Sequence, residues 1–264
     1  MAIIDTTGLE PFADLLKEVY GDLAKPGVAQ VGIALATVIG LINTCLSPIK
    51  FLNEKTELNR QNNLKLIAKR FAEIPPENII EAPSEIAVPI AEKLVYVSND
   101  VLRNMYIELM AKASTNKLND SAHPSFINII NNLSPDEALL LGYLRNRPYL
   151  PYVDIILKGA NNIQYHIEDL VCLTPGLDLN FQNNFKAYLS NLEANGLVNV
   201  MPDRVFVDEK EYEIYINYMN NNLVNYEKNL KDLKKDPFSH SPYQLIKGTI
   251  EVTDFGHLFF NAVY

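Results

Sequence analysis

The sequence is poor in cysteine and in basic residues. Only two of its 264 residues are cysteines, Cys45 and Cys172, and no metal-binding spacing surrounds either one. This excludes a disulfide-stapled secreted scaffold and a thiolate zinc site, and it favours a reducing cytoplasm. Lys and Arg number 23 against 32 Asp and Glu, which gives a formal net charge of -9. A surface of this sign repels phosphate backbones and anionic lipid, so general affinity for nucleic acid is not expected.

Catalytic motifs are also absent. The sequence has no glycine-rich phosphate loop, dinucleotide fingerprint, nucleophile elbow or HExxH. His166 and Asp169 could share a helix face, but we interpret them as a solvated surface pair and not as a metal site. We therefore predict no catalytic, cofactor-binding or metal-binding residues and a protein that is not an enzyme.

What the sequence does contain is a helical apolar pattern. Apolar residues make up 48% of the chain, which is enough for a substantial core. Their spacing predicts a mainly α protein with helices over 51–74, 84–97, 99–118, 125–130 and 134–144. We divide the chain into N-terminal helices (1–75), a helical core (76–133) and a C-terminal domain (134–264).

One N-terminal segment, 26–49, contains no charged residue and is long enough to cross a bilayer if helical, since about 20 residues suffice. Within it Gly32, Ala36 and Gly40 repeat at steps of four and form a narrow stripe on which another helix can approach closely. Such stripes occur in membranes and in soluble cores. Several polar residues in the run favour a buried soluble helix, and membrane contact stays open.

The C-terminal domain has the outline of a winged helix. A helix over 181–195 ends at Gly196, and alternating residues predict strands over 197–200, 205–207 and 248–253, with a final helix over 254–264. Helices followed by a small antiparallel ribbon predict a winged-helix-like fold.

Between the ribbon strands, residues 209–236 predict a long inserted amphipathic helix. Its apolar residues follow alternating steps of four and three, as in a heptad seam: Tyr212, Ile216, Met219, Leu223, Tyr226, Leu230 and Leu233. Most amphipathic helices bury such a stripe on their own chain, and a partner protein is the alternative.

Several short motifs occur together in one order. They are Pro75-Pro76-Glu77-Asn78-Ile79-Ile80, Pro83-Ser84-Glu85-Ile86-Ala87-Val88-Pro89-Ile90, Leu102-Arg103-Asn104-Met105-Tyr106, His123-Pro124-Ser125-Phe126 and Leu133-Ser134-Pro135-Asp136. This series resembles the bacterial Abi-alpha family, best over residues 70–147 and more loosely on both sides. The resemblance implies a cytoplasmic protein of abortive infection against phage and brings no catalytic residues with it. Glu85, His123, Pro124 and Phe126 match motif positions, and each has a structural explanation; His123 and Glu85 are candidates for a polar tie between helices.

These observations lead to a functional hypothesis with two alternatives. We expect a non-enzymatic anti-phage defence protein that acts through contact with a protein or a membrane, the latter through 26–49, and that binds a partner or self-associates. One alternative is a winged-helix regulator of nucleic acid or of a replication or transcription protein, which requires a basic patch from Lys186, Arg204, Lys210 and Lys247. A hydrolase site assembled from distant carboxylates is a third class, and no motif points to it.

Overall fold

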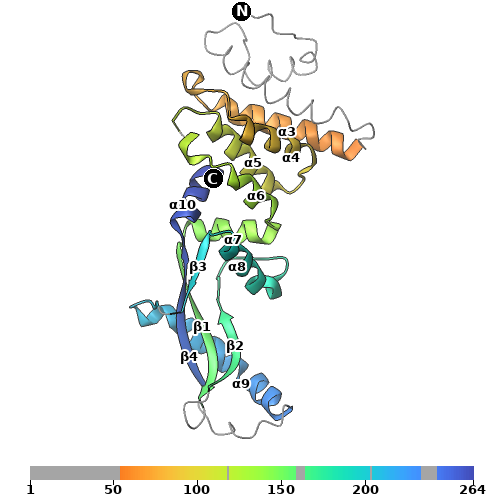
Figure 1. Ribbon diagram of the computed structural model, residues 1–264. Helices are drawn as coiled ribbons and strands as arrows, with labels where there is room; N and C mark the ends of the chain where they lie inside the picture. Colours follow the sequence, from red (N-terminus) through yellow and green to blue (C-terminus); the bar gives the residue numbers. More distant parts are fainter. Residues whose placement is uncertain (1–53, 118, 159–163, 203, 233–242) are drawn as a thin grey trace, which may run out of the picture. The chain divides into compact units, whose positions relative to one another are not determined.

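The computed structural model describes residues 54–117, 119–158, 164–202, 204–232 and 243–264 (Figure 1). The chain divides into two compact units. The first comprises the chain up to Ala138 together with Leu258–Tyr264, and the second comprises Leu139–His257. The uncharged run 26–49, with its stripe of Gly32, Ala36 and Gly40, lies outside the described residues.

The first unit is helical. Its helices are α3 (Glu54–Ala72), α4 (Ser84–Tyr96), α5 (Asp100–Ala113) and α6 (Ser125–Asn131), with 3-10 turns at Pro76–Asn78 and Asn119–Ser121. Helix α5 begins after Asn99, whose Oδ1 accepts the backbone N–H groups of Val101 and Leu102. Helix α7 (Pro135–Arg145) begins with a capping box in which Ser134 and Glu137 exchange hydrogen bonds. The predicted helices are therefore confirmed, with ends that differ by a few residues.

Aliphatic side chains fill the core of this unit, and a few polar side chains join its helices. Phe126 of α6 is fully buried and meets Phe259 edge to face, with ring centroids 5.2 Å apart. Arg70 of α3 and Glu108 of α5 form a two-pronged ion pair, with Nε to Oε1 at 2.6 Å. Asn63 Nδ2 donates to the carbonyls of Leu94 and Val97, which closes the end of α4.

The second unit is built on an antiparallel sheet. Its strands are β1 (Tyr149–Lys158), β2 (Gln164–Val171), β3 (Val198–Met201) and β4 (Tyr243–Val252), in the order β2-β1-β4-β3. The central pair β1 and β4 stays in register over nine residues, from Tyr149 opposite Glu251 to Leu157 opposite Tyr243. Gly248 lies opposite Tyr152 because only a residue without a side chain leaves room for that ring.

Strand β2 contains two more residues than the β1 segment it pairs with. Val153 faces Val171, Ile155 faces Glu168 and Ile156 faces His166, so the register shifts twice over four residues of β1. At one shift Leu170 adopts a left-handed backbone with φ of 50°. These are β-bulges, which redirect the side chains that follow them.

The winged-helix prediction was wrong. Residues 205–207 form no strand, and β3 pairs instead with the end of β4, which belongs to a four-stranded sheet and not to a small ribbon. Strands β1 and β2 were not predicted. The reason lies in β1, where buried residues occur on both faces of the strand and hide the period-two alternation that identifies a strand.

The prediction of one long inserted helix over 209–236 also needs correction. The segment begins with a 3-10 helix, η5 (Glu209–Tyr212), and continues as α9 (Glu213–Asp232); residues 233–242 lie outside the described chain. Within α9, Tyr215 and not Ile216 is buried beside Tyr212, since Ile216 is 45% exposed. Met219, Leu223 and Tyr226 of the predicted stripe do pack on the sheet, whereas the side chains of Leu230 and Leu233 are not described.

The remaining helices agree with the sequence. They are α8 (Phe185–Ala194), which follows the 3-10 turn Gln182–Asn184, and α10 (Asp254–Val263). Gly196 has φ of 72°, which confirms its predicted place as the left-handed cap of α8.

Candidate functional site

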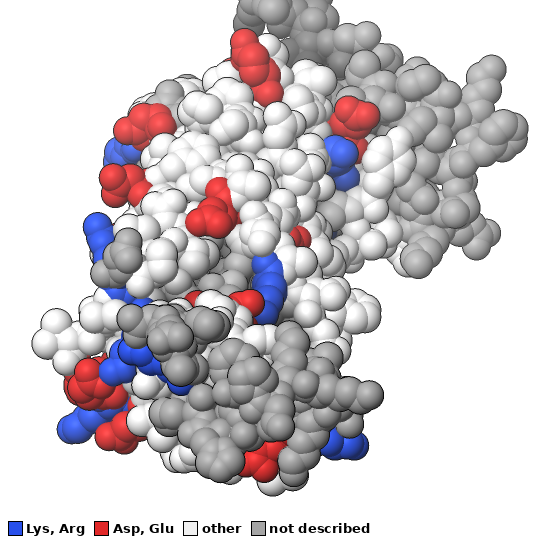
Figure 2. Space-filling view, turned by 60° about the horizontal axis from the view of Figure 1, so that its bottom comes forward, with Lys and Arg blue, Asp and Glu red and all other residues white. Residues whose placement is uncertain are grey.

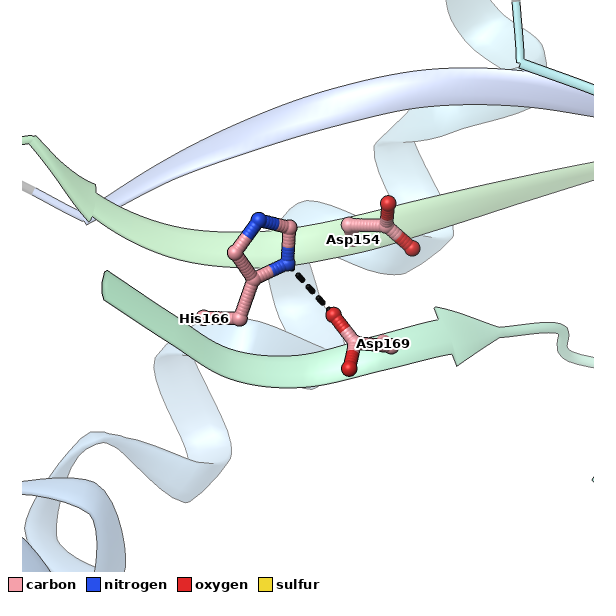
Figure 3. Close-up of side chains that lie close together, drawn as sticks. All are labelled: Asp154, His166 and Asp169. Carbon is pink, nitrogen blue, oxygen red and sulfur yellow. Dashed lines mark hydrogen bonds and ion pairs between the residues drawn. The ribbon is translucent and has the colours of Figure 1, made fainter. Parts of the chain in front are cut away.

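Three potential metal ligands converge on the pair of strands β1 and β2. Asp154 comes from β1, and His166 and Asp169 come from β2 (Figure 3). One ligand atom from each residue lies within 4.8 Å of the other two. His166 and Asp169 are exposed and Asp154 is half-buried, so a small solute reaches the cluster from solvent.

The bulges of β2 bring these side chains to one face. Val153 and Ile155 point to the α9 side of the sheet, so Asp154 between them points to the other side. In a regular strand His166 and Asp169, three positions apart, would point to opposite faces. One of the two extra residues of β2 lies between His166 and Glu168. The side chains of His166 and Asp169 therefore point to the same face and meet.

Two hydrogen bonds define the local geometry. His166 Nδ1 and Asp169 Oδ1 are 2.5 Å apart, in an ion pair when the imidazole is protonated. Asp154 Oδ1 accepts the backbone N–H of Leu170 at 2.7 Å, which supplies an acceptor for a group that the bulge has removed from the strand ladder. Asp154 therefore stabilises the bulge that positions its two neighbours.

The sequence interpretation was incomplete here. His166 and Asp169 do form an exposed pair, but on a bulged strand and not on a helix. Asp154 was missed because it lies twelve positions before His166, and only the strand register brings the two together. No sequence spacing carries that signal.

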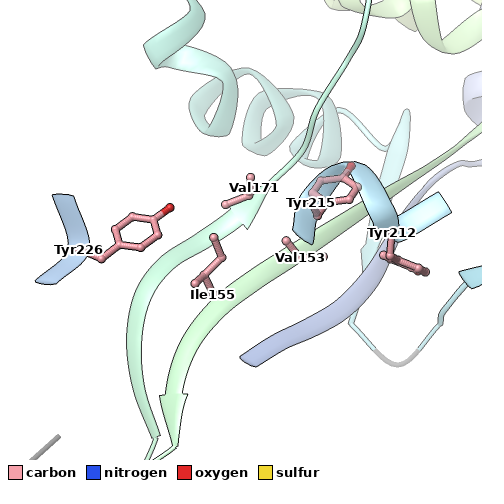
Figure 4. Close-up of a cluster of buried hydrophobic side chains, with 6 residues drawn as sticks. All are labelled: Val153, Ile155, Val171, Tyr212, Tyr215 and Tyr226. Atoms are coloured by element: carbon pink, nitrogen blue, oxygen red, sulfur yellow. The ribbon is translucent and has the colours of Figure 1, made fainter. Parts of the chain in front are cut away.

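The opposite face of the sheet is closed by α9 through tyrosines. The carboxylate of Glu168 accepts hydrogen bonds from the hydroxyls of Tyr218, at 3.0 Å, and Tyr226, at 2.7 Å. Burial raises the pKa of both tyrosines, and the negative charge of Glu168 raises it further. Figure 4 shows Tyr226, Tyr215 and Tyr212 around Val153, Ile155 and Val171.

A buried thiol adjoins the same cluster. Tyr215 donates its hydroxyl hydrogen to the carbonyl of Pro151 at 2.5 Å and accepts the N–H of Leu173 at 3.2 Å. Burial raises the pKa of Cys172 beside it to about 12. Cys172 is consequently a thiol and not a thiolate near neutral pH, and it is a poor nucleophile.

The family-motif residues lie in the helical unit. Glu85 is exposed in the first turn of α4, and His123 and Pro124 are exposed just before α6. His123 Nδ1 lies 2.6 Å from Ser125 Oγ and accepts the Ser125 N–H, which orders the start of α6. The buried ring of Phe126 follows directly. The polar tie between Glu85 and His123 stays a prediction.

Two of the four residues of the hypothetical basic patch form ion pairs with acidic side chains. Arg204 pairs with Glu251 at 2.6 Å, and Lys247 pairs with Glu209. Figure 2 shows basic and acidic side chains interspersed over the face in view. With the winged-helix fold overturned, the regulator hypothesis has lost the fold on which it depended.

The motif series of the helical unit and the sequence that follows it correspond to one known family. A model of the family Abortive infection alpha matches residues 55–263. The chain belongs to this family. The match confirms the resemblance seen in the sequence, and it extends through both units of the Abi-alpha chain. The family name connects the chain with abortive infection, a form of antiviral defence.

No curated protein and no solved structure matches the chain. Within the part of this Abi-alpha protein that the structure describes, no helix has both the length and the hydropathy needed to span a bilayer.

Proposed function

We propose that this Abi-alpha protein defends a bacterium against phage in the cytoplasm by contacting another protein, without catalysing a reaction. Family membership supports the defence role. Support for protein contact comes from the surface of the second unit, and one segment of it carries the argument.

This segment, residues 205–216, exposes four branched apolar side chains. They are Val205, Val207, Ile214 and Ile216, and Val207 is 99% exposed. The backbone beside Val207 is held in place, because the side chain of the next residue, Asp208, accepts the N–H of Lys210 and caps the start of η5. Covering exposed apolar side chains with a partner removes them from water and so makes the free energy of binding more favourable. We name residues 205–216 the apolar segment.

Membrane contact through 26–49 is the second candidate, because that run contains no charged residue and is long enough to cross a bilayer if helical. The two candidates place the decisive residues in different parts of the chain. Substitutions in residues 205–216 and in residues 26–49 therefore distinguish protein contact from membrane contact.

The test measures phage protection in bacteria that express the full chain. If protein contact is decisive, Val205→Ser with Val207→Ser lowers protection at least tenfold in efficiency of plating, while Gly32→Leu with Gly40→Leu has little effect. Val224→Ser is the matched control, because Val224 is also an exposed valine of the same unit, at 78%.

The reverse pattern, in which only the Gly32 and Gly40 variant loses protection and wild-type protein sediments with membranes, would support the membrane candidate. Protection unchanged in both double variants would contradict contact through either segment. Soluble expression of each variant is measured in parallel.

A further inference from the structure

We propose that Asp154, His166 and Asp169 bind one divalent transition-metal ion, with Zn²⁺ as the reference ion. The proposal goes beyond the role in defence, and it requires no catalysis. We name these three residues the Asp-His-Asp cluster.

The spacing of the donor atoms fits a single ion. Zinc binds nitrogen and oxygen ligands at about 2.0–2.2 Å, which places neighbouring donors about 3–4 Å apart. In the cluster all donor atoms already lie within 4.8 Å of one another. Small side-chain rotations close the remaining distance, and the backbone of the paired strands need not move.

The types of donor indicate the class of ion. Two carboxylates balance the charge of a divalent ion, and an imidazole favours zinc and its transition-metal neighbours over Mg²⁺ and Ca²⁺, which prefer oxygen ligands. The exposure of His166 and Asp169 leaves room for water to complete the coordination. His166 Nδ1 and Asp169 Oδ1 now share a hydrogen bond, and these are two of the atoms that the ion would join.

The bond to Leu170 does not prevent Asp154 from acting as a ligand. It uses Oδ1 for the backbone N–H, and a carboxylate has a second oxygen with free lone pairs. The same bond restrains the orientation of the carboxylate, as hydrogen bonds to ligand side chains commonly do in metal sites. The competing explanation is that Asp154 only stabilises the bulge and that His166 and Asp169 are only a surface pair.

Isothermal titration calorimetry with ZnCl₂ on the full-length protein, without a polyhistidine tag, distinguishes these explanations. We expect one zinc ion per chain at this site. Asp154→Asn and His166→Gln should each weaken binding by at least about tenfold, since even the loss of a group that only hydrogen-bonds to a ligand weakens metal sites by about 10- to 100-fold. His123→Gln is the matched control, because His123 is another exposed histidine and lies outside the cluster, with its Nδ1 2.6 Å from Ser125 Oγ.

Thermal melting separates binding from folding. The Asp154→Asn side chain keeps an oxygen that can accept the Leu170 N–H, so this variant should melt like wild type when no zinc is present. Asp154→Ala removes the acceptor and should melt at a lower temperature. Zinc at 100 times its dissociation constant should raise the wild-type melting temperature by about 5 °C or more. It should not raise that of Asp154→Asn.

Absence of zinc binding to wild type would overturn the proposal, as would binding that survives unchanged in Asp154→Asn and His166→Gln. Equal affinity for Mg²⁺ would overturn the assignment to a transition metal.

Discussion

The two units bury polar groups in different ways. The helical unit keeps its core largely aliphatic and uses side-chain hydrogen bonds at helix ends, as at Asn63 and Asn99. The sheet unit places tyrosines in its core, and the hydroxyls of Tyr212, Tyr215 and Tyr226 each bond a group on another segment. Apolar contact is not directional, whereas a hydrogen bond is. The hydroxyls therefore specify how α9 lies on the sheet.

This difference extends to the backbone. The register shifts of β2 and the left-handed Leu170 belong to the sheet unit, and so does the Asp-His-Asp cluster. Irregular backbone of this kind re-aims side chains and is common beside functional sites. The family motifs of the helical unit thus contribute buried side chains such as Phe126, while the unusual local geometry lies in the sheet unit.

The largest expected effect comes from a substitution in the core of the helical unit. Phe126→Ala removes a fully buried ring and should lower the free energy of unfolding by about 3–5 kcal/mol. Urea denaturation followed by circular dichroism measures the change. Phe181→Ala, at a phenylalanine 65% exposed, is the control and should cost less than about 1 kcal/mol. Equal losses in the two variants would contradict the assignment of Phe126 to the core.

A smaller effect tests the directional contacts of the sheet unit. Tyr215→Phe keeps the ring but leaves the carbonyl of Pro151 and the N–H of Leu173 without this partner, at a cost of about 1–3 kcal/mol. The same urea experiment applies. Tyr149→Phe on β1 is the control, because Tyr149 is half exposed. A neutral Tyr215→Phe would show that shape alone positions α9.

The ion pairs of the two units should also differ. In double-mutant cycles we expect a coupling of about 1 kcal/mol for Arg70 with Glu108, which is two-pronged and partly buried, and less for Arg204 with Glu251, whose arginine side chain is 59% exposed. Salt at 1 M should weaken mainly the second coupling. The opposite order would contradict this comparison.

The smallest effect concerns thiol reactivity. In a Cys45→Ala background, Cys172 should react slowly with a disulfide reagent at pH 8, because its raised pKa of about 12 keeps it protonated there. Stability conferred by the protonated thiol should be present below the pKa of the unfolded chain and be lost as the pH rises toward 12. Urea should accelerate the reaction by exposing the thiol. Fast reaction in the native protein would show that this part of the sheet unit opens readily.

The sequence predicted helices better than strands for a physical reason. Helices α4, α5 and α10 have apolar stripes and clear ends, both of which are local properties of the chain. Strand β1 is buried on both faces, so its period is hidden. The position of Asp154 beside His166 depends on strand pairing and on two register shifts, and neither is a local property. Ile216 of the predicted seam is exposed because Tyr215, one position earlier on α9, takes the place beside Tyr212, and the spacing of apolar residues does not distinguish these two neighbours.

The bulges of β2 have a further consequence for how the protein behaves at high concentration. β2 is an outer strand of the described sheet, and an outer strand offers unpaired backbone groups to the strands of other molecules. Its two extra residues interrupt the even spacing that an incoming strand needs. The same irregularity that gathers the three ligands thus protects the edge of the sheet against edge-to-edge aggregation.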